Sequence, residues 1–260
     1  MAPSSLPWIG TSLTNTGRVR TSNQDAFAVD NELGLWIIAD GMGGHAGGNI
    51  ASELAVASIM DHVRTSARPW PSAGDRLQHA TTVLTHAITA GKTAIQERIA
   101  GAPELSSMGT TVVAAWLCPP PAPSLAIAHV GDSRAYVIRD EQLIALTTDH
   151  SLVQQLVSEG QITLEESWDH PKKNVLVRAL GLDYPSTPDI ALHPLGPQDI
   201  VLLCTDGLMK MISENDILSV ILESRDSPEE SCRRLISRAN AAGGKDNTTV
   251  LLITPAHTPN

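Results

Sequence analysis

Five aspartates lie beside apolar segments that have the composition of β-strands. Asp40, Asp132 and Asp206 each follow such a segment, and Asp25 and Asp246 each precede one. A single aspartate in such a place is easily a turn residue. Several of them in one chain favour strand ends that converge on one rim, where the carboxylates would repel one another and raise each other's pKa. A pair of divalent cations would remove that repulsion.

Oxygen ligands favour Mg²⁺ or Mn²⁺ over zinc or copper. The histidines and cysteines show no cluster with the sequence spacing of a metal site, which argues against zinc. Two divalent cations a few ångströms apart generate hydroxide near neutral pH and bind the oxygens of a transferring group. The residues alone therefore predict a carboxylate-held metal centre suited to in-line displacement at phosphorus.

The segment 35–48 contains the most informative aspartate. Its first part, 35–39, reads as a buried strand and then breaks into Asp40-Gly41-Met42-Gly43-Gly44-His45. Five glycines between positions 41 and 48 let the backbone approach a ligand closely. The carboxylate and nearby backbone carbonyls would then face a hard cation. The simpler interpretation is a strand-to-helix turn with Asp40 as a turn or cap residue.

The elements that must position these residues come in blocks rather than in βαβ alternation. Residues 149–174 are polar with short helical pieces at 152–159 and 163–168, so we expect a surface insertion there, and we expect a hairpin loop in the proline-rich segment 118–123. The chain shows no internal repeat or linker, which favours one domain. Strands are predicted at 8–14, 26–29, 33–39, 108–117, 124–130, 135–138, 142–147, 189–193, 200–204 and 250–253, and helices at 49–64, 75–99, 214–222 and 228–242.

The composition excludes several classes of function. Lys and Arg number 18 against 28 Asp and Glu, and the net charge of −10 argues against a nucleic-acid or anionic-membrane partner. No apolar run approaches the roughly 18 residues of a membrane span, and the first residues do not resemble a signal peptide. The three cysteines are far apart with no CxxC, so we expect core thiols in a reducing compartment. These features predict a soluble, cytoplasmic protein.

Eight short motifs occur in order along nearly the whole chain. They are Arg20-x-x-Asn23-Gln24-Asp25, Asp40-Gly41-Met42-Gly43-Gly44-His45-x-x-Gly48, Gly109-Thr110-Thr111, Gly131-Asp132-Ser133-Arg134, Asp149-His150-Ser151, Arg178-Ala179-Leu180-Gly181, Thr205-Asp206-Gly207-Leu208 and Asp246-Asn247-x-Thr249. Any one motif is weak, but all of them in this order are specific. Together they resemble the motifs of bacterial metal-dependent serine/threonine protein phosphatases, the PPM or type 2C family.

The resemblance implies an α+β fold, a four-layer α-β-β-α sandwich of two antiparallel sheets flanked by helices. It implies a single catalytic domain over residues 1–260, with a flap insertion at about 149–174 that helps to choose substrates. The implied reaction is hydrolysis of phosphoserine and phosphothreonine in proteins by a water that two metals activate. The implied partners are phosphoprotein substrates, among them a bacterial Ser/Thr kinase and its targets, and we expect a monomer.

The resemblance also implies a role for each aspartate. Asp40 would bridge two Mn²⁺ or Mg²⁺ ions, with the carbonyl of Gly41 on the second ion. Asp206 and Asp246 would complete the first ion, and Asp25 would act mostly through bound water.

Two further residues take roles from the family. Arg20 would hold the substrate phosphate. Many bacterial members carry a third, weaker metal, for which Asp132 is a candidate ligand and Asp206 a second one. Gln24 stands where many eukaryotic members have Glu, so the second metal loses an anionic partner; bacterial relatives often share this pattern.

Three histidines have competing interpretations. His45 is a candidate general acid for the leaving seryl oxygen, because imidazole titrates near neutral pH, or else a hydrogen-bonded residue at the start of a helix. His129, on an apolar strand, is expected to be a hydrogen-bonded core residue. His150 is expected to support the flap rather than bind a ligand, and Arg134 is expected to form a structural ion pair.

Two other functions compete with catalysis by a phosphatase. A pseudophosphatase would bind a kinase or phosphoprotein without turnover, but it would be expected to lack metal acids, and Asp40, Asp206 and Asp246 are all present. A metal-dependent nuclease or phosphodiesterase would use similar ions, but the acidic composition and the motif order argue against it.

Overall fold

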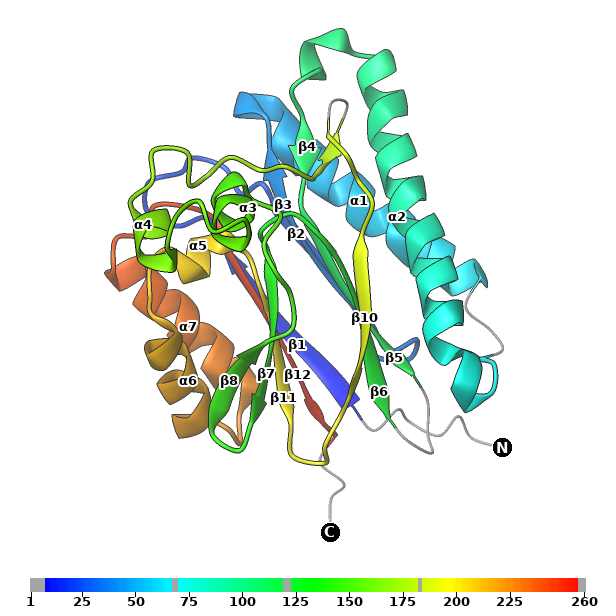
Figure 1. The fold of residues 1–260 in the computed structure, drawn as a ribbon, viewed down its shortest axis with the longest axis vertical. Helices are drawn as coiled ribbons and strands as arrows, with labels where there is room; N and C mark the ends of the chain where they lie inside the picture. Colours follow the sequence, from blue (N-terminus) through cyan, green and yellow to red (C-terminus); the bar gives the residue numbers. More distant parts are fainter. Residues whose placement is uncertain (1–7, 67–69, 119–122, 182–183, 257–260) are drawn as a thin grey trace.

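The computed structural model describes residues 8–66, 70–118, 123–181 and 184–256. Within them, two antiparallel sheets pack face to face with helices on both outer faces (Figure 1). This arrangement confirms the α+β, four-layer sandwich. The proline-rich loop expected at 118–123 falls mostly outside the described residues.

The first sheet has the strand order β1-β12-β11-β7-β8. Strand β1 pairs along its whole length with β12, so the two ends of the chain meet in one ladder. Strands β7 and β8, which match the strands predicted at 135–138 and 142–147, form a hairpin, and its turn residues Asp140 and Glu141 have φ of 49° and 57°, the left-handed values of a tight hairpin turn. The bounds are Trp8–Asn15 (β1), Thr248–Pro255 (β12), Ile200–Cys204 (β11), Arg134–Arg139 (β7) and Gln142–Ala145 (β8).

The second sheet has the order β10-β6-β5-β3-β4-β9, with β2 paired to β3. Two predictions need correction here. Strand β3 does not end at 39, because Gly41 and Met42 still pair with β4. The single strand expected at 108–117 is two strands, because the Asp40 N–H leaves the ladder and donates to the Thr111 side-chain Oγ1 at 3.0 Å, while the Thr111 N–H still donates to the Asp40 carbonyl at 2.9 Å. The bounds are Asp25–Asp30 (β2), Leu35–Met42 (β3), Gly109–Thr110 (β4), Val112–Cys118 (β5), Ser124–Val130 (β6), Leu180–Gly181 (β9) and Asp189–Pro194 (β10).

Helices cover both sheets. Helices α1 (Gly44–Ser66) and α2 (Arg76–Ala100) pack on the second sheet, and α6 (Glu214–Glu223) and α7 (Pro228–Ala241) pack on the first (Figure 1). Helix α1 begins before the predicted position 49, inside the glycine-rich segment. Among the described residues, no helix combines the length and the apolar composition that crossing a bilayer demands. The short helices are α3 (Leu152–Ser158), α4 (Leu164–Trp168), the unpredicted α5 (Asp206–Met209) and the 3₁₀ turns Ala73–Asp75 and Pro103–Leu105.

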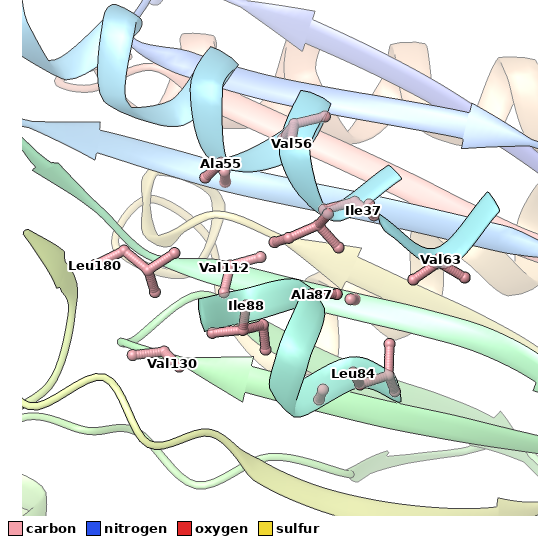
Figure 2. Packing of buried hydrophobic residues seen from close by; sticks show 14 of the residues in the cluster. Ile37, Ala55, Val56, Val63, Leu84, Ala87, Ile88, Val112, Val130 and Leu180 are labelled. Atoms are coloured by element: carbon pink, nitrogen blue, oxygen red, sulfur yellow. The ribbon is translucent and has the colours of Figure 1, made fainter. Parts of the chain in front are cut away.

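Alternation along β3 explains how the layers are filled. Leu35 and Ile37 join the cluster that includes α1 and α2, part of which Figure 2 shows, whereas Trp36 and Ile38 face the other sheet. Both faces of β3 are therefore buried, which is why its sequence is a continuous apolar run. The three cysteines are buried free thiols, as expected for core residues.

Candidate active site

The strand ends converge on one cavity of about 710 Å³. Four of the five aspartates, Asp40, Asp132, Asp206 and Asp246, contribute to its lining. Arg20 and Gly41, which the sequence also predicted as site residues, line the same cavity. Asp25 lies behind this surface, directly opposite Asp40 in the β2–β3 ladder.

The opposition of Asp25 and Asp40 is unfavourable in a metal-free protein, because like charges directly across a ladder repel. Burial raises the pKa of the Asp25 carboxyl to about 7, against hydrogen bonds from Thr249 and Thr205 that lower it. Burial, followed by the charge of Asp25, raises the pKa of Asp40 well above its usual range. The two carboxyls are thus buried close to each other, and their negative charges must be neutralised by protons or by bound cations.

The hydrogen bonds of Asp25 join the two sheets. The hydroxyls of Thr205 and Thr249, at the ends of β11 and β12, both donate to Asp25 Oδ2, at 2.9 and 2.6 Å. The other oxygen, Asp25 Oδ1, is buried and has no hydrogen-bond partner in the part of the chain that the structure describes. Sequence reasoning assigned no role to Thr205 or Thr249, although both stand in the motifs.

Two close backbone approaches require glycine. A Cβ on Gly41 would overlap the backbone oxygens of Gly48 and Gln24, so the first turn of α1 packs directly against the end of β3. The Gly41 N–H donates to the Gln24 carbonyl at 3.0 Å. A Cβ on Gly207 would overlap the backbone oxygen of Asn247, so α5 can approach the start of β12 only with glycine at this position.

Asn247 connects three segments at the bottom of the cavity. Its side-chain Nδ2 donates to the carbonyls of Thr16 and Ser22 at 2.9 Å, and its Oδ1 accepts from the Gln24 N–H at 2.8 Å. Its own N–H donates to Asp246 Oδ1 at 2.9 Å. Asn247 therefore positions Asp246. Asn247 is part of the last motif, but no role was predicted for it from the sequence.

Two cations lie among the acids. Arg20 Nη2 pairs with Asp246 Oδ2 at 2.9 Å, and the Arg20 side chain is 53% exposed. Lys210 pairs with Asp206 Oδ2 and also lines the cavity. Burial alone would lower the pKa of Lys210, but the carboxylates of Asp206, Asp132 and Asp40 together outweigh burial and raise that pKa. Lys210 was not predicted, although its spacing of four residues from Asp206 places both on one face of a helical turn.

Asp132 and His45 are two further predicted site residues, and the structure describes the side chain of Asp132 only. Asp132 follows β6 and Gly131, whose φ is 109°. Burial and the charge of Asp206 raise the pKa of Asp132 to about 7. His45 lies in the first turn of α1, but its side chain is outside the described part of the structure, so its role as general acid stays a prediction.

Outside the cavity, the structure brings together a histidine cluster that no sequence spacing indicated. His129, His150 and Asp189 bring three ligand atoms within 4.8 Å of one another. They come from strands and a loop that are distant in sequence, so sequence spacing could not reveal them. The guanidinium of Arg178 already pairs with the acid of this cluster, because Arg178 Nη1 donates to Asp189 Oδ1 at 2.6 Å. One ring nitrogen of His150 is also occupied, because Nδ1 accepts from the Gly131 N–H at 3.2 Å.

The expected structural roles of His129 and Arg134 are confirmed. His129 is buried, its Nε2 lies 2.9 Å from the Thr148 carbonyl, and its ring stacks on that of His150. Arg134 Nε and Nη2 donate to the two carboxylate oxygens of Asp149 at 2.7 Å each. This bidentate pair lies at the start of the segment 149–174.

The donor set of the cavity fits divalent cations. Asp206 Oδ1, like Asp25 Oδ1, is buried and has no hydrogen-bond partner among the described residues. Buried oxygens without a partner cost free energy unless a proton or cation meets them. Carboxylates and backbone carbonyls are the ligands that Mg²⁺ and Mn²⁺ prefer.

Comparisons with known proteins agree with this geometry. A family model described as protein phosphatase 2C matches residues 10–246. The serine/threonine phosphatase stp of Listeria welshimeri is 38% identical over 246 residues, covering 92% of this chain and 93% of that protein. The crystal structure of the Mycobacterium tuberculosis serine/threonine phosphatase PstP/Ppp has a TM-score of 0.81 at 35% identity and covers 96% of this chain and 99% of that one. A PstP catalytic domain in complex with 2 manganese ions has a TM-score of 0.79 at 33% identity, with coverage of 96% and 99%.

Proposed function

This chain belongs to the protein phosphatase 2C family, and from that premise we propose which of its residues carry the reaction. It is a metal-dependent serine/threonine protein phosphatase, a hydrolase that acts on phosphoproteins. The observation that supports the site assignment best is the convergence of four aspartates on one cavity, with Asp206 Oδ1 and Asp25 Oδ1 buried and unpartnered.

The metal ligands are Asp40, Asp206, Asp246 and the carbonyl of Gly41, with Asp25 behind them. Two Mn²⁺ or Mg²⁺ ions would supply a lowered pKa for a bound water and positive charge for the phosphate oxygens. Asp40 would serve both ions, because it lies opposite Asp25 and interacts electrostatically with all four of the other aspartates.

Arg20 and His45 act on the substrate. Arg20 lies at the edge of the cavity on Asp246, so its guanidinium reaches a phosphate beside the metal ligands and can bind two of its oxygens. His45 remains the candidate that protonates the leaving seryl oxygen. No group on the protein becomes phosphorylated in this scheme.

The segment 149–174 is the flap. It contains α3 and α4, and Asn174 at its end lines the cavity together with Val175 and Leu176. A segment so placed contacts the residues that flank a phosphorylated side chain. We take residues 1–260 as one catalytic domain with this flap inserted.

A Ser/Thr kinase and its targets are the proposed partners, and the chain acts as a monomer. A phosphatase that reverses kinase action needs the same phosphorylated segments as substrates. A comparison of phosphopeptides between cells with and without the protein tests this: unchanged phosphoserine and phosphothreonine sites would contradict the kinase pairing. Light scattering tests the monomer.

The experiment that tests the reaction is hydrolysis of a phosphothreonine peptide with and without Mn²⁺, with EDTA and okadaic acid as controls. We expect turnover that requires the metal and ignores okadaic acid. Asp40→Asn should remove that turnover because the variant loses the central carboxylate. Full activity in Asp40→Asn would contradict the ligand assignment. Folded, metal-loaded wild-type protein without turnover would indicate a pseudophosphatase, an alternative that the similarity to named phosphatases argues against. A nuclease assay with the same ions tests the remaining alternative.

A further inference from the structure

A lysine lies where the acids of the cavity would otherwise attract one more cation. Lys210 follows α5, and its N–H donates to the Asp206 carbonyl at 2.9 Å, so the backbone makes one helical turn between the two residues. Residues four apart on a turn present their side chains to each other. The contact between Lys210 and Asp206 thus follows from the local backbone.

The two oxygens of Asp206 have different environments. Oδ2 pairs with the ammonium of Lys210, whereas Oδ1 is buried and accepts no hydrogen bond from any residue that the structure describes. The carboxylate is only 16% exposed and the Lys210 side chain 38%. One oxygen of Asp206 is thus available to the proposed metal centre, and the other already has a cation.

The charge of Lys210 also acts on the neighbouring acids. Lys210 interacts electrostatically with Asp132 and Asp40 as well as with Asp206, and Asp132 lines the same cavity. Asp132 and Asp206, which line the same cavity, are the candidate ligands that the family resemblance suggests for a third, weaker ion. A divalent ion bound to both would therefore have to share Asp206 with the ammonium group of Lys210, and like charges on one carboxylate repel each other.

We propose that the ammonium of Lys210 takes the place of a third divalent cation between Asp206 and Asp132, so that this phosphatase binds two ions and not three. The inference rests on the proposed assignment of the metal ligands. It makes Lys210 a residue that determines metal stoichiometry. Substituting a neutral side chain for Lys210 should open a third site at Asp132 and Asp206.

The test is titration of the full chain with Mn²⁺ by calorimetry, with bound metal counted by elemental analysis after gel filtration. We compare the wild type with Lys210→Met, which keeps the length and removes the charge, and with Lys210→Gln as a second neutral variant. Lys210→Arg keeps a cation at the site. Lys172→Met removes a lysine that is exposed in the flap and does not line the cavity, so it controls for net charge.

We expect two ions in the wild type, Lys210→Arg and Lys172→Met. Both neutral variants should take up a third Mn²⁺, at least about tenfold more tightly than any third ion binds to the wild type. Adding Asp132→Asn to Lys210→Met should remove this third ion. Circular dichroism shows that each variant is folded before titration.

The outcomes separate this inference from the proposed function. A third ion in the wild type, or two ions in both folded neutral variants, would overturn the role of Lys210 and leave the two-metal assignment intact. A wild type that binds no Mn²⁺ would overturn the ligand assignment, and the role of Lys210 with it.

Discussion

Asp25 and Asp40 face each other across β2 and β3, a placement that would destabilise an ordinary sheet. The sequence explains this placement in part, because both residues belong to a set of five aspartates that each lie beside an apolar strand, as expected for a metal centre. What local sequence could not show is that the Asp25 carboxylate accepts from Thr205 and Thr249, which lie 180 and 224 residues away. Long-range pairing of that kind depends on the packing of two sheets.

At Asp132, burial should produce a measurable pH dependence. The folded-state pKa is raised from 3.8 to about 7, so between these values the folded metal-free protein binds more protons than the unfolded chain. The contribution of Asp132 to stability is therefore lost as pH rises through this window. Asp132→Asn removes this loss. The free energy of unfolding of the variant, relative to that of the metal-free wild type, should therefore increase as the pH rises, by on the order of 1–4 kcal/mol at about pH 8.

Urea unfolding in EDTA at about pH 5 and pH 8 measures this difference. Comparing variant and wild type at each pH cancels the titration of other groups. Asp226→Asn, at an exposed aspartate, is the control. The same stability difference at both values would contradict the buried titration of Asp132.

Arg20 is expected to serve the substrate rather than the metals. Arg20→Ala should lower kcat/KM for a phosphopeptide by roughly 10- to 100-fold, the size of a lost charge-assisted hydrogen bond, and Arg20→Lys should recover part of it. Mn²⁺ affinity should not weaken, because the variant removes a cation from Asp246. Steady-state kinetics with calorimetry would detect a metal-binding role if affinity fell with activity.

Among the elements, β3 and α5 decide the geometry of the acids. Sequence periodicity predicted the strand but ended it early, because Asp and Gly are poor strand residues. Pairing with β4 and the close approach of Gly48 extend the strand to Met42. Helix α5 was too short for any periodicity to reveal.

Gly207→Ala should disturb the contact between α5 and β12. The new Cβ would overlap the Asn247 carbonyl and move Asp206 away from Asp246. We expect a loss of stability of about 1–3 kcal/mol and weaker Mn²⁺ binding, measured by urea unfolding and calorimetry. Gly74→Ala is the matched control, because a Cβ there meets no atom within 4 Å. Equal stability and equal Mn²⁺ affinity in the two variants would show that the close approach of Gly207 to Asn247 is not required for the position of Asp206.

For the whole molecule, the site connects the two sheets. Asp40 and Asp25 belong to the second sheet, and Asp206 and Asp246 lie at strand ends of the first. Ions bound to both sets would hold the sheets together and stabilise only the folded state.

Mn²⁺ should therefore raise the melting temperature. At about 100 times the dissociation constant the gain is about 2.7 kcal/mol, or roughly 5–10 °C for a chain of this size. Scanning calorimetry with Mn²⁺ and with EDTA measures the shift. Asp40→Asn should lose most of it, and an equal shift in this variant would place the stabilising ions elsewhere.

The three thiols should be inert in the native protein. They are buried, and burial raises the pKa of Cys118 to about 11 and those of Cys204 and Cys232 to about 12. Thiolate is the reactive form. A chromogenic disulfide reagent should therefore react with none of them before denaturation and with all three after it; rapid native labelling would indicate an opened core.

Residue types and their local spacing were enough to predict the strand and helix blocks, the rim of aspartates and the family motifs. Which groups meet depends on the packed fold: Asp25 with Thr249, Asp206 Oδ2 with Lys210, and His129 with His150. Those contacts, except the helical turn at Lys210, join segments far apart in the chain. Local patterns carry no information on such distances, since the register and packing of whole sheets set them.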